Sequence, residues 1–304
     1  MSRESASAMK RIAITGASGF LGVSLTEYLK RGGYEVLRIG RGASADIRWD
    51  PAARVIAPRA LDGVEAVVHL AGEPIAQRWN ARVREELKTS RVRGTTLIAE
   101  ACARATPRPA ALLSGSAIGI FGDRGDELLD ESSETGGDYL AEIGREWEGA
   151  TAAASAAGVR VVHLRTGLVL HPRGGALAKM LLPFQLGVGG RLGSGKQWMS
   201  WIARSDWLSA VHFALRSPSL GGAVNLTAPE PATNATFAST LGRVLGRPAL
   251  APVPAFVLRA LYGEMADAAI LGSQRVVPRV LESAGFAFAH PTLSGALRHE
   301  LDRP

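Results

Sequence analysis

Three glycines spaced three residues apart stand near the start of the chain, at Gly16, Gly19 and Gly22. A short β-branched run at 11–15 precedes them, and an amphipathic pattern of helical period follows them. A second apolar run, at 35–39, then has the length and composition of a strand. Strand, glycine turn, helix and strand in this order predict a βαβ unit, in which the two strands run parallel.

The same alternation of strand and helix patterns continues along the first half of the chain. Short apolar runs alternate with segments of helical length, which predicts a parallel sheet that is covered by helices on both faces. The expected strands are 65–71, 110–116 and 159–170, and the expected helices are 80–104 and 139–157. We therefore predict an α/β fold with a doubly wound (Rossmann), mostly parallel sheet.

The place of the three glycines between a strand and a helix is typical of a dinucleotide-binding turn. Gly16 permits the tight turn, Gly19 lets the backbone approach a pyrophosphate, and Gly22 lets the helix pack closely on the strand. The N-terminus of the helix offers free N–H groups to the anion, and Ser18 adds a hydroxyl donor. The alternative is that the glycines only shape a turn.

The residue after the second strand selects between the two nicotinamide dinucleotides. An acid there accepts a hydrogen bond from the ribose 2′-OH of NAD, whereas a base pairs with the 2′-phosphate of NADP. No acid is present, and Arg41 offers a planar guanidinium that suits a phosphate dianion. The sequence therefore favours NADP(H). Arg38 is a weaker candidate, and an ordinary surface role is the alternative for Arg41.

Several segments resemble a known family; they read TGASGFLG (15–22), HLAGEPIA (69–76), RWN…EELKTSR (78–91) and SGSAIGIFGDRGDE (114–127). They look like the extended short-chain dehydrogenase/reductases. Within these, the chain resembles an atypical subgroup of NAD(P)-dependent epimerase-family proteins, the nucleoside-diphosphate sugar epimerase-like proteins. The likeness runs from about Lys10 to Leu301 and includes 193–207 and 225–248.

This resemblance implies cofactor contacts beyond the glycine turn. It places Leu70 and Ala71, followed by Gly72, beside the adenosine and the nicotinamide-side ribose. It also implies a role at the NADP site for Glu86 and Arg91, for which a plain helix-surface pair is the alternative. The expected cofactor-binding residues are Gly16, Ser18, Gly19, Phe20, Leu21, Gly22, Arg41, Leu70, Ala71, Gly72, Glu86 and Arg91.

Hydride chemistry in the family that the chain resembles uses a serine or threonine, a tyrosine acid/base and a lysine four residues later. Ser116 matches the serine and is expected to anchor a carbonyl or hydroxyl group. Tyr139 stands at the expected distance, but Ile143 replaces the lysine and carries no charge. A tyrosine with a pKa of about 10 is then a poor base near neutral pH. Ser116 and Tyr139 are the catalytic candidates, and a role in the pocket wall is the alternative for Tyr139.

The expected organisation has three parts. They are a disordered N-terminus at 1–9, an NADP-binding Rossmann domain at 10–173, and at 174–304 mainly a substrate-binding lobe, with some segments returning to the sheet. The resemblance implies an NADP(H)-dependent oxidoreductase or epimerase that acts on a small hydroxyl- or carbonyl-bearing, sugar-like substrate. The missing lysine supports the alternative, a non-catalytic NADP(H)-binding regulatory or redox-sensor protein.

Composition and charge exclude several other classes of protein. The net charge of +7 is spread along the chain without a long basic run, so we expect no nucleic-acid partner. No segment reaches the roughly 20 apolar residues that a membrane span needs. Cys102 is the single cysteine, which rules out an internal disulfide and fits a cytoplasmic protein. We expect no bound metal. The oligomeric state is left open, a homodimer included.

Overall fold

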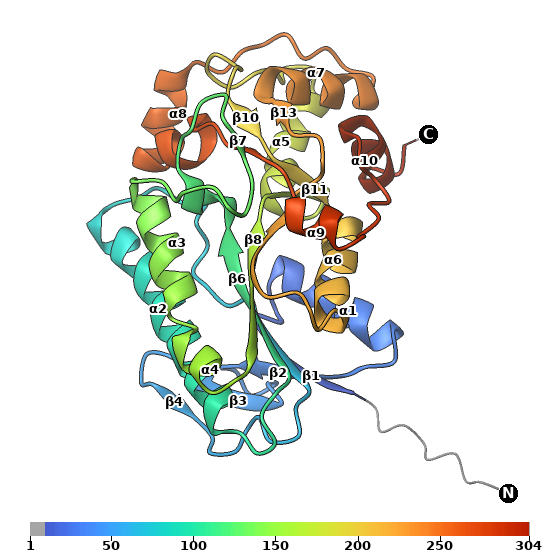
Figure 1. Cartoon of the computed structure of the whole chain (residues 1–304). Coiled ribbons are helices and arrows are strands. Elements are labelled where there is room, and N and C mark those ends of the chain that lie inside the picture. The colour runs from blue at the N-terminus through green and yellow to red at the C-terminus, as the bar shows by residue number, and fades with distance from the viewer. Residues whose placement is uncertain (1–9, 304) are drawn as a thin grey trace, which may run out of the picture.

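The computed structural model describes residues 10–303 and contains an eight-stranded sheet (Figure 1). In sheet order its strands are β12 (Gly222–Leu226), β8 (Arg160–Thr166), β6 (Ala111–Ala117), β5 (Ala66–His69), β1 (Arg11–Thr15), β2 (Glu35–Gly40), β3 (Ile47–Asp50) and β4 (Val55–Ile56). All neighbouring strands run parallel except β3 and β4. The predicted doubly wound α/β fold is confirmed. The N-terminus at 1–9, expected to be disordered, lies outside the described residues.

Helices cover both faces of the sheet (Figure 1). One face packs against α1 (Phe20–Arg31) and α6 (Arg204–Arg216), the other against α2 (Ala81–Arg104) and α4 (Ala152–Ala156). Successive side chains of a strand point to opposite faces, so that along β1 Ile14 joins the first core and Ala13 the second. Because both faces are buried, the strands read as continuous apolar runs rather than alternating ones.

A smaller lobe lies at the carboxyl end of the sheet, at the top of Figure 1. Its core holds the fully buried Trp201 and Phe237. Its helices are α5 (Gly175–Gln185), α7 (Asn234–Leu245), α8 (Ala255–Tyr262), α10 (Leu293–Glu300) and a π-helical turn, η2 (Ala266–Leu271). The helix α9 (Arg279–Ser283) instead packs on the sheet, where Leu281 joins the first core. The short strand pairs of the lobe are β9 (Leu168–Leu170) with β11 (Trp201–Ala203), β10 (Trp198–Met199) with β13 (Ala232–Thr233), and β7 (Leu128–Leu129) with β14 (Arg275–Val276).

Two of the expected elements are divided in the structure. The expected helix 139–157 is α3 (Tyr139–Gly149) followed by α4, because the Thr151 hydroxyl donates a hydrogen bond to the Glu148 carbonyl at 2.6 Å and ends the first helix. The expected strand 159–170 is β8 followed by β9. The two separate at Gly167, where the backbone passes so close to Ser200 that a Cβ would lie 2.5 Å from its oxygen.

The strands β3 and β4 were not expected. They extend the sheet beyond β2 and bury Ile47 and Trp49 against the second core. Between β6 and α3 the chain forms a short 3₁₀ turn, η1 (Ile118–Phe121). None of the helices in the described part of the chain is both long and apolar enough to cross a bilayer.

Candidate functional site

The glycine turn joins β1 to α1 at the carboxyl edge of the sheet. Gly16 has φ +67°, and a Cβ there would lie 2.8 Å from the Leu70 carbonyl carbon. A Cβ at Gly22 would lie 2.0 Å from the Gly16 oxygen, so close packing of α1 on the turn requires glycine. At Gly19 a Cβ would meet only the Gly16 oxygen, at 3.3 Å, within residues 10–303. The protein therefore leaves the space above Gly19 open to a ligand.

The N-terminus of α1 begins at this open position. Gly19 is the N-cap residue, and no side chain of the described residues caps this end of the helix. Its own N–H donates to the Gly16 carbonyl at 2.9 Å. The uncapped N–H groups of the first turn, together with the positive end of the helix dipole, favour an anion there. The Phe20 side chain points elsewhere, because its ring packs against His171 with a centroid distance of 5.6 Å.

The carboxyl end of β5 is bonded directly to the end of β1. The Thr15 hydroxyl accepts hydrogen bonds from the backbone N–H groups of Leu70, at 3.0 Å, and Ala71, at 3.2 Å. Its own proton therefore goes to His69 Nδ1, 2.7 Å away. Burial lowers the pKa of His69 to about 4, so the ring is neutral and able to accept this bond. The predicted residues Leu70 and Ala71 are thus held beside Gly16.

The two arginines considered for the 2′-phosphate have different surroundings. Arg38 Nε lies 3.1 Å from Asp46 Oδ2 and forms an ion pair with it. Arg41, just beyond the carboxyl end of β2, is exposed and makes no ion pair or hydrogen bond with any residue of the described range. Its guanidinium is free to bind an anionic ligand.

The predicted pair on α2 is separated by the structure. Arg91 is partly buried; its side chain would lie 3.5 Å from a Cβ at Gly72, and its guanidinium carbon lies 5.0 Å from the centre of the Trp147 ring. Burial lowers the pKa of Arg91 to about 10, so it remains charged at neutral pH. Glu86 is exposed and forms an ion pair with Arg82 at 3.1 Å. Only Arg91 is brought to the strand ends.

Ser116 belongs to a buried charged cluster that the sequence did not indicate. Its hydroxyl donates to Glu148 Oε1 at 2.7 Å, and Arg165 donates to both carboxylate oxygens of Glu148, at 2.8 and 3.0 Å. Burial raises the pKa of Glu148, but the bonds from Arg165 outweigh it and leave the pKa below its ordinary value. The one available signal was Arg165 itself, a charge inside an apolar strand, which requires a buried partner.

Tyr139 is the first residue of α3, and its hydroxyl is engaged by α2. It donates a hydrogen bond to the Arg84 backbone carbonyl, and the Arg84 guanidinium lies 4.1 Å from the centre of its ring. Trp79 contacts the same ring edge-on at 5.7 Å between centroids, and the buried Ile143 belongs to the same apolar cluster. Burial raises the pKa of Tyr139, so its hydroxyl stays protonated at neutral pH.

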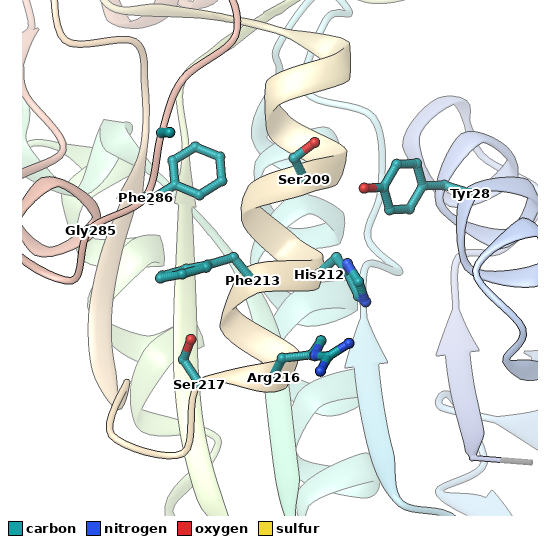
Figure 2. Close-up of a pocket in the computed structure, with 9 residues that line it drawn as sticks. Tyr28, Ser209, His212, Phe213, Arg216, Ser217, Gly285 and Phe286 are labelled. Atoms are coloured by element: carbon teal, nitrogen blue, oxygen red, sulfur yellow. The ribbon is translucent and has the colours of Figure 1, made fainter.

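A hollow of about 450 Å³ lies elsewhere on the molecule, beside α6. Figure 2 shows Tyr28 of α1 on one side of α6 and Phe286 on the other. Its lining contains none of the residues that the sequence singled out for the cofactor or for catalysis. The candidate site therefore rests on the glycine turn and the strand ends, not on this hollow.

Comparison with known proteins extends over nearly the whole chain. Residues 12–226 match the model of the NAD dependent epimerase/dehydratase family, and residues 253–300 match a domain of unknown function, DUF1731. Epimerase family protein MT2273 of Mycobacterium tuberculosis is 43% identical over 297 residues, 96% of this chain and 98% of the relative. Human epimerase family protein SDR39U1 is 36% identical over 95% of this chain and 98% of its own length.

Solved structures agree with this assignment. The crystal structure of human SDR39U1 (isoform 2) with NADPH has a TM-score of 0.90 and 33% identity, and the match covers 96% of this chain and 99% of that one. A nucleoside-diphosphate sugar epimerase from Corynebacterium glutamicum has a TM-score of 0.80 and 38% identity, and the match covers 97% of this chain and 58% of that one. This chain belongs to the NAD dependent epimerase/dehydratase family.

Proposed function

We propose that this protein binds NADP(H) at the carboxyl edge of its sheet, with the pyrophosphate above Gly19 and the 2′-phosphate at Arg41. The observation that carries the proposal is the open space above Gly19 at an uncapped helix N-terminus. The unpaired guanidinium of Arg41 favours NADP(H) over NAD(H). The NADPH in the structure of the human relative supports the same choice.

The remaining predicted residues would hold the rest of the cofactor. Leu70 and Ala71 are fixed beside the turn by Thr15, and Arg91 brings a positive charge next to Gly72. A bound nicotinamide supplies or accepts a hydride. We propose an oxidoreductase or epimerase that acts on a small hydroxyl- or carbonyl-bearing, sugar-like substrate, with the lobe formed by most of 174–304 as the substrate-binding part.

Calorimetric titration with NADPH and with NADH tests the cofactor assignment. A charge-assisted bond to the 2′-phosphate contributes about 1.5 to 3 kcal/mol, so we expect NADPH to bind at least tenfold more tightly than NADH. Arg41→Ala removes this preference because it removes the charged partner of the 2′-phosphate. Gly19→Val weakens both cofactors, since its side chain fills the space left for the pyrophosphate.

The matched control for Arg41→Ala is Arg38→Ala, because Arg38 lies in β2, three residues before Arg41, but is paired with Asp46. This variant should keep the preference for NADPH. Equal affinity of the wild type for the two cofactors would contradict the role of Arg41. Unchanged affinity of a folded Gly19→Val variant would show that the pyrophosphate binds elsewhere.

A second candidate function is an NADP(H)-binding regulatory or sensor protein without turnover. It is favoured by the hydrogen bonds that the two catalytic candidates, Ser116 and Tyr139, make within the protein. The Tyr139 hydroxyl is bonded to a backbone carbonyl with no lysine behind it, and the Ser116 hydroxyl is bonded to Glu148. Both hydroxyl protons are donated to acceptors within the protein, which weighs against the usual acid/base pair.

Single-turnover hydride transfer with a panel of alcohols and carbonyl compounds separates the two functions. An enzyme should show a change in NADPH absorbance with at least one compound. Ser116→Ala should then lower the rate more than Tyr139→Phe does, because positioning a reacting oxygen does not require the missing lysine. Tight NADPH binding without any hydride transfer would favour the sensor. A rate that falls a hundredfold or more in Tyr139→Phe would restore the tyrosine as the acid/base.

A further inference from the structure

One end of the lobe exposes a group of large apolar side chains. Nine such side chains are exposed among residues 10–303, and five of them lie within two short stretches of the lobe. They are Leu182 (63% exposed), Leu186 (68%), Val188 (59%), Leu250 (85%) and Phe256 (70%). The first two are four positions apart and share one face at the end of α5. A single exposed leucine is ordinary, but a group of this size marks a surface that contacts another apolar phase.

The segments that carry these side chains lie against one another. The chain after α5, residues 187–193, runs beside residues 248–253, where the Ala251 N–H donates to the Gly189 carbonyl at 3.3 Å. The helix α8 begins two residues after the second segment. The connection from α7 to α8, which contains Leu250, runs along the outer end of the lobe, at the top of Figure 1. The exposed apolar side chains therefore gather at this end of the molecule.

The charged side chains of these segments are all basic. Residues 178–193 and 243–261 contain five Lys or Arg and no Asp or Glu. Three of the arginines are exposed, and their guanidinium groups form no ion pair or hydrogen bond within the described residues; they are Arg191, Arg243 and Arg247. The end of α7 lies beside Leu250, because a Cβ at Gly242 would lie 2.8 Å from the Ala249 Cβ. We call the five apolar and three basic side chains together the lobe surface.

The combination of apolar and basic side chains limits what the lobe surface can bind. A second copy of this chain, related by a two-fold axis, would place the arginines of one copy against those of the other, and like charges repel. A nucleic acid backbone would pair with the arginines but would leave Leu250 and Phe256 in water. An anionic lipid bilayer suits both kinds of side chain, since it offers phosphates at its surface and hydrocarbon directly beneath them.

We propose that the lobe surface binds an anionic lipid membrane. Leu250 and Phe256, its two most exposed apolar side chains, enter the boundary between headgroups and acyl chains. Arg191, Arg243 and Arg247 contact the headgroup phosphates. The lobe then lies against the membrane, and the edge of the sheet formed by β3 and β4 lies away from it (Figure 1). Binding in this way requires no cofactor, so the inference goes beyond the proposed function.

Co-sedimentation of the full chain with lipid vesicles tests the proposal. We expect binding to vesicles of phosphatidylcholine mixed with phosphatidylglycerol, little binding to phosphatidylcholine alone, and weaker binding as the ionic strength rises. Arg243→Gln combined with Arg247→Gln should lower the partition coefficient about thirtyfold, because each basic residue near an anionic surface contributes about fivefold. Leu250→Gln should lower it about tenfold, because it removes an apolar side chain from the lipid.

Each change has a control of the same kind away from the lobe. Arg48→Gln combined with Arg216→Gln removes the same net charge from two exposed arginines, one on β3 and one at the end of α6. Val55→Gln removes an exposed apolar side chain from β4. Both controls should change vesicle binding less than about twofold, because an exposed charge acts over little more than a Debye length. Circular dichroism checks that every variant is folded.

Several results would overturn the inference. No binding of the wild type to anionic vesicles at low salt would exclude the membrane, and an equal loss in the control double variant would reduce the effect to net charge. Unchanged binding in Leu250→Gln would leave only non-specific attraction. A dimer that dissociates in Leu250→Gln, seen by analytical ultracentrifugation, would assign the lobe surface to a second copy. Equally tight binding to soluble polyglutamate would assign it to an acidic protein.

Discussion

His69 shows how one buried side chain orders the strand ends. It accepts the Thr15 hydroxyl proton at Nδ1, and its neutral form therefore carries a proton on Nε2. This Nε2 is buried without a hydrogen-bond partner within the described residues. The Trp49 ring lies edge-on to the imidazole, at 5.9 Å between centroids. A protonated ring could not accept the Thr15 bond, so the geometry depends on the neutral form.

We expect this histidine to make stability depend on pH. The unfolded chain binds a proton at the ordinary pKa of 6.5, whereas the folded chain does so only near 4. Between these values the unfolded state holds more protons, so stability falls as the pH is lowered through this window. At pH 5 the titration of His69 should lower the free energy of unfolding by about 2 kcal/mol relative to its value at high pH. Urea unfolding at pH 7 and pH 5 measures it.

The matched variants are His69→Asn and His299→Asn. The first has no titrating group at the buried position, so it should lose less stability on acidification than the wild type does. His299 is exposed, and its replacement removes a histidine from the surface for comparison. The same acid-induced loss in His69→Asn as in the wild type would assign the effect to other groups.

Tyr139→Phe tests whether this residue is structural. The change removes the hydrogen bond to the Arg84 carbonyl and keeps the ring against Trp79. We expect a loss of about 1 kcal/mol in the free energy of unfolding and an unchanged NADPH affinity. Denaturant unfolding and calorimetry measure the two quantities. A large fall in NADPH affinity without a loss of stability would instead place the hydroxyl at the cofactor.

At the scale of elements, a buried ion pair between Arg165 and Glu148 joins β8 to α3, and the Ser116 hydroxyl ties β6 to the same carboxylate. Ser116 and Arg165 are register partners on neighbouring parallel strands, and Glu148 reaches both from the helix. The side chains of Arg165 and Glu148 are only 8% and 12% exposed, so each charge depends on the other for its compensation. The pair therefore fixes how α3 sits on the ends of the two strands.

Glu148→Gln should be strongly destabilising. It leaves the Arg165 guanidinium buried without a countercharge, for which a loss of about 3 to 5 kcal/mol is expected. Glu86→Gln is the control, because it breaks an exposed pair with Arg82 and should cost less than about 1 kcal/mol. Urea unfolding at neutral pH compares the two. Equal, small losses in both variants would mean that water compensates the charge of Arg165.

At the scale of the whole molecule, the chain passes repeatedly between sheet and lobe. After α5 in the lobe it returns to the sheet as α6 and β12, and then re-enters the lobe as α7. Contacts also join the loop after η1 to the lobe, with Trp198 Nε1 donating to Asp126 at 2.7 Å and Ser273 Oγ to the Gly125 carbonyl at 2.6 Å. Neither part can unfold without breaking the other.

We therefore expect a single unfolding transition. Far-ultraviolet circular dichroism reports helices of both parts, and tryptophan fluorescence reports both cores, through Trp201 in the lobe and Trp207 against the sheet. The two signals should give coincident curves with urea, and saturating NADPH should shift both to higher urea concentration by the same amount. Two separate transitions would show that the lobe is an independent unit.

The βαβ unit and the tasks of the three glycines could be predicted from the sequence because they are local. Gly16 makes the tight turn, Gly19 leaves open space above the backbone, and Gly22 lets α1 pack closely on the turn. These three residues lie within a stretch of seven positions. The alternation of strands and helices likewise predicted the sheet, since periodicity and length reflect which faces are buried. The place of Arg41 just after the second strand could also be predicted, whereas its lack of a partner within the described residues could not.

The partners of the catalytic candidates depended on contacts between distant segments. Ser116 bonds to Glu148, 32 positions away, and Tyr139 bonds to Arg84, 55 positions away. A hydrogen bond requires its donor and acceptor atoms to lie about 3 Å apart and in line. A buried side chain can keep its charge only where the surrounding protein supplies a partner. No local pattern encodes either condition, so the packing of strands and helices determines which side-chain protons are free.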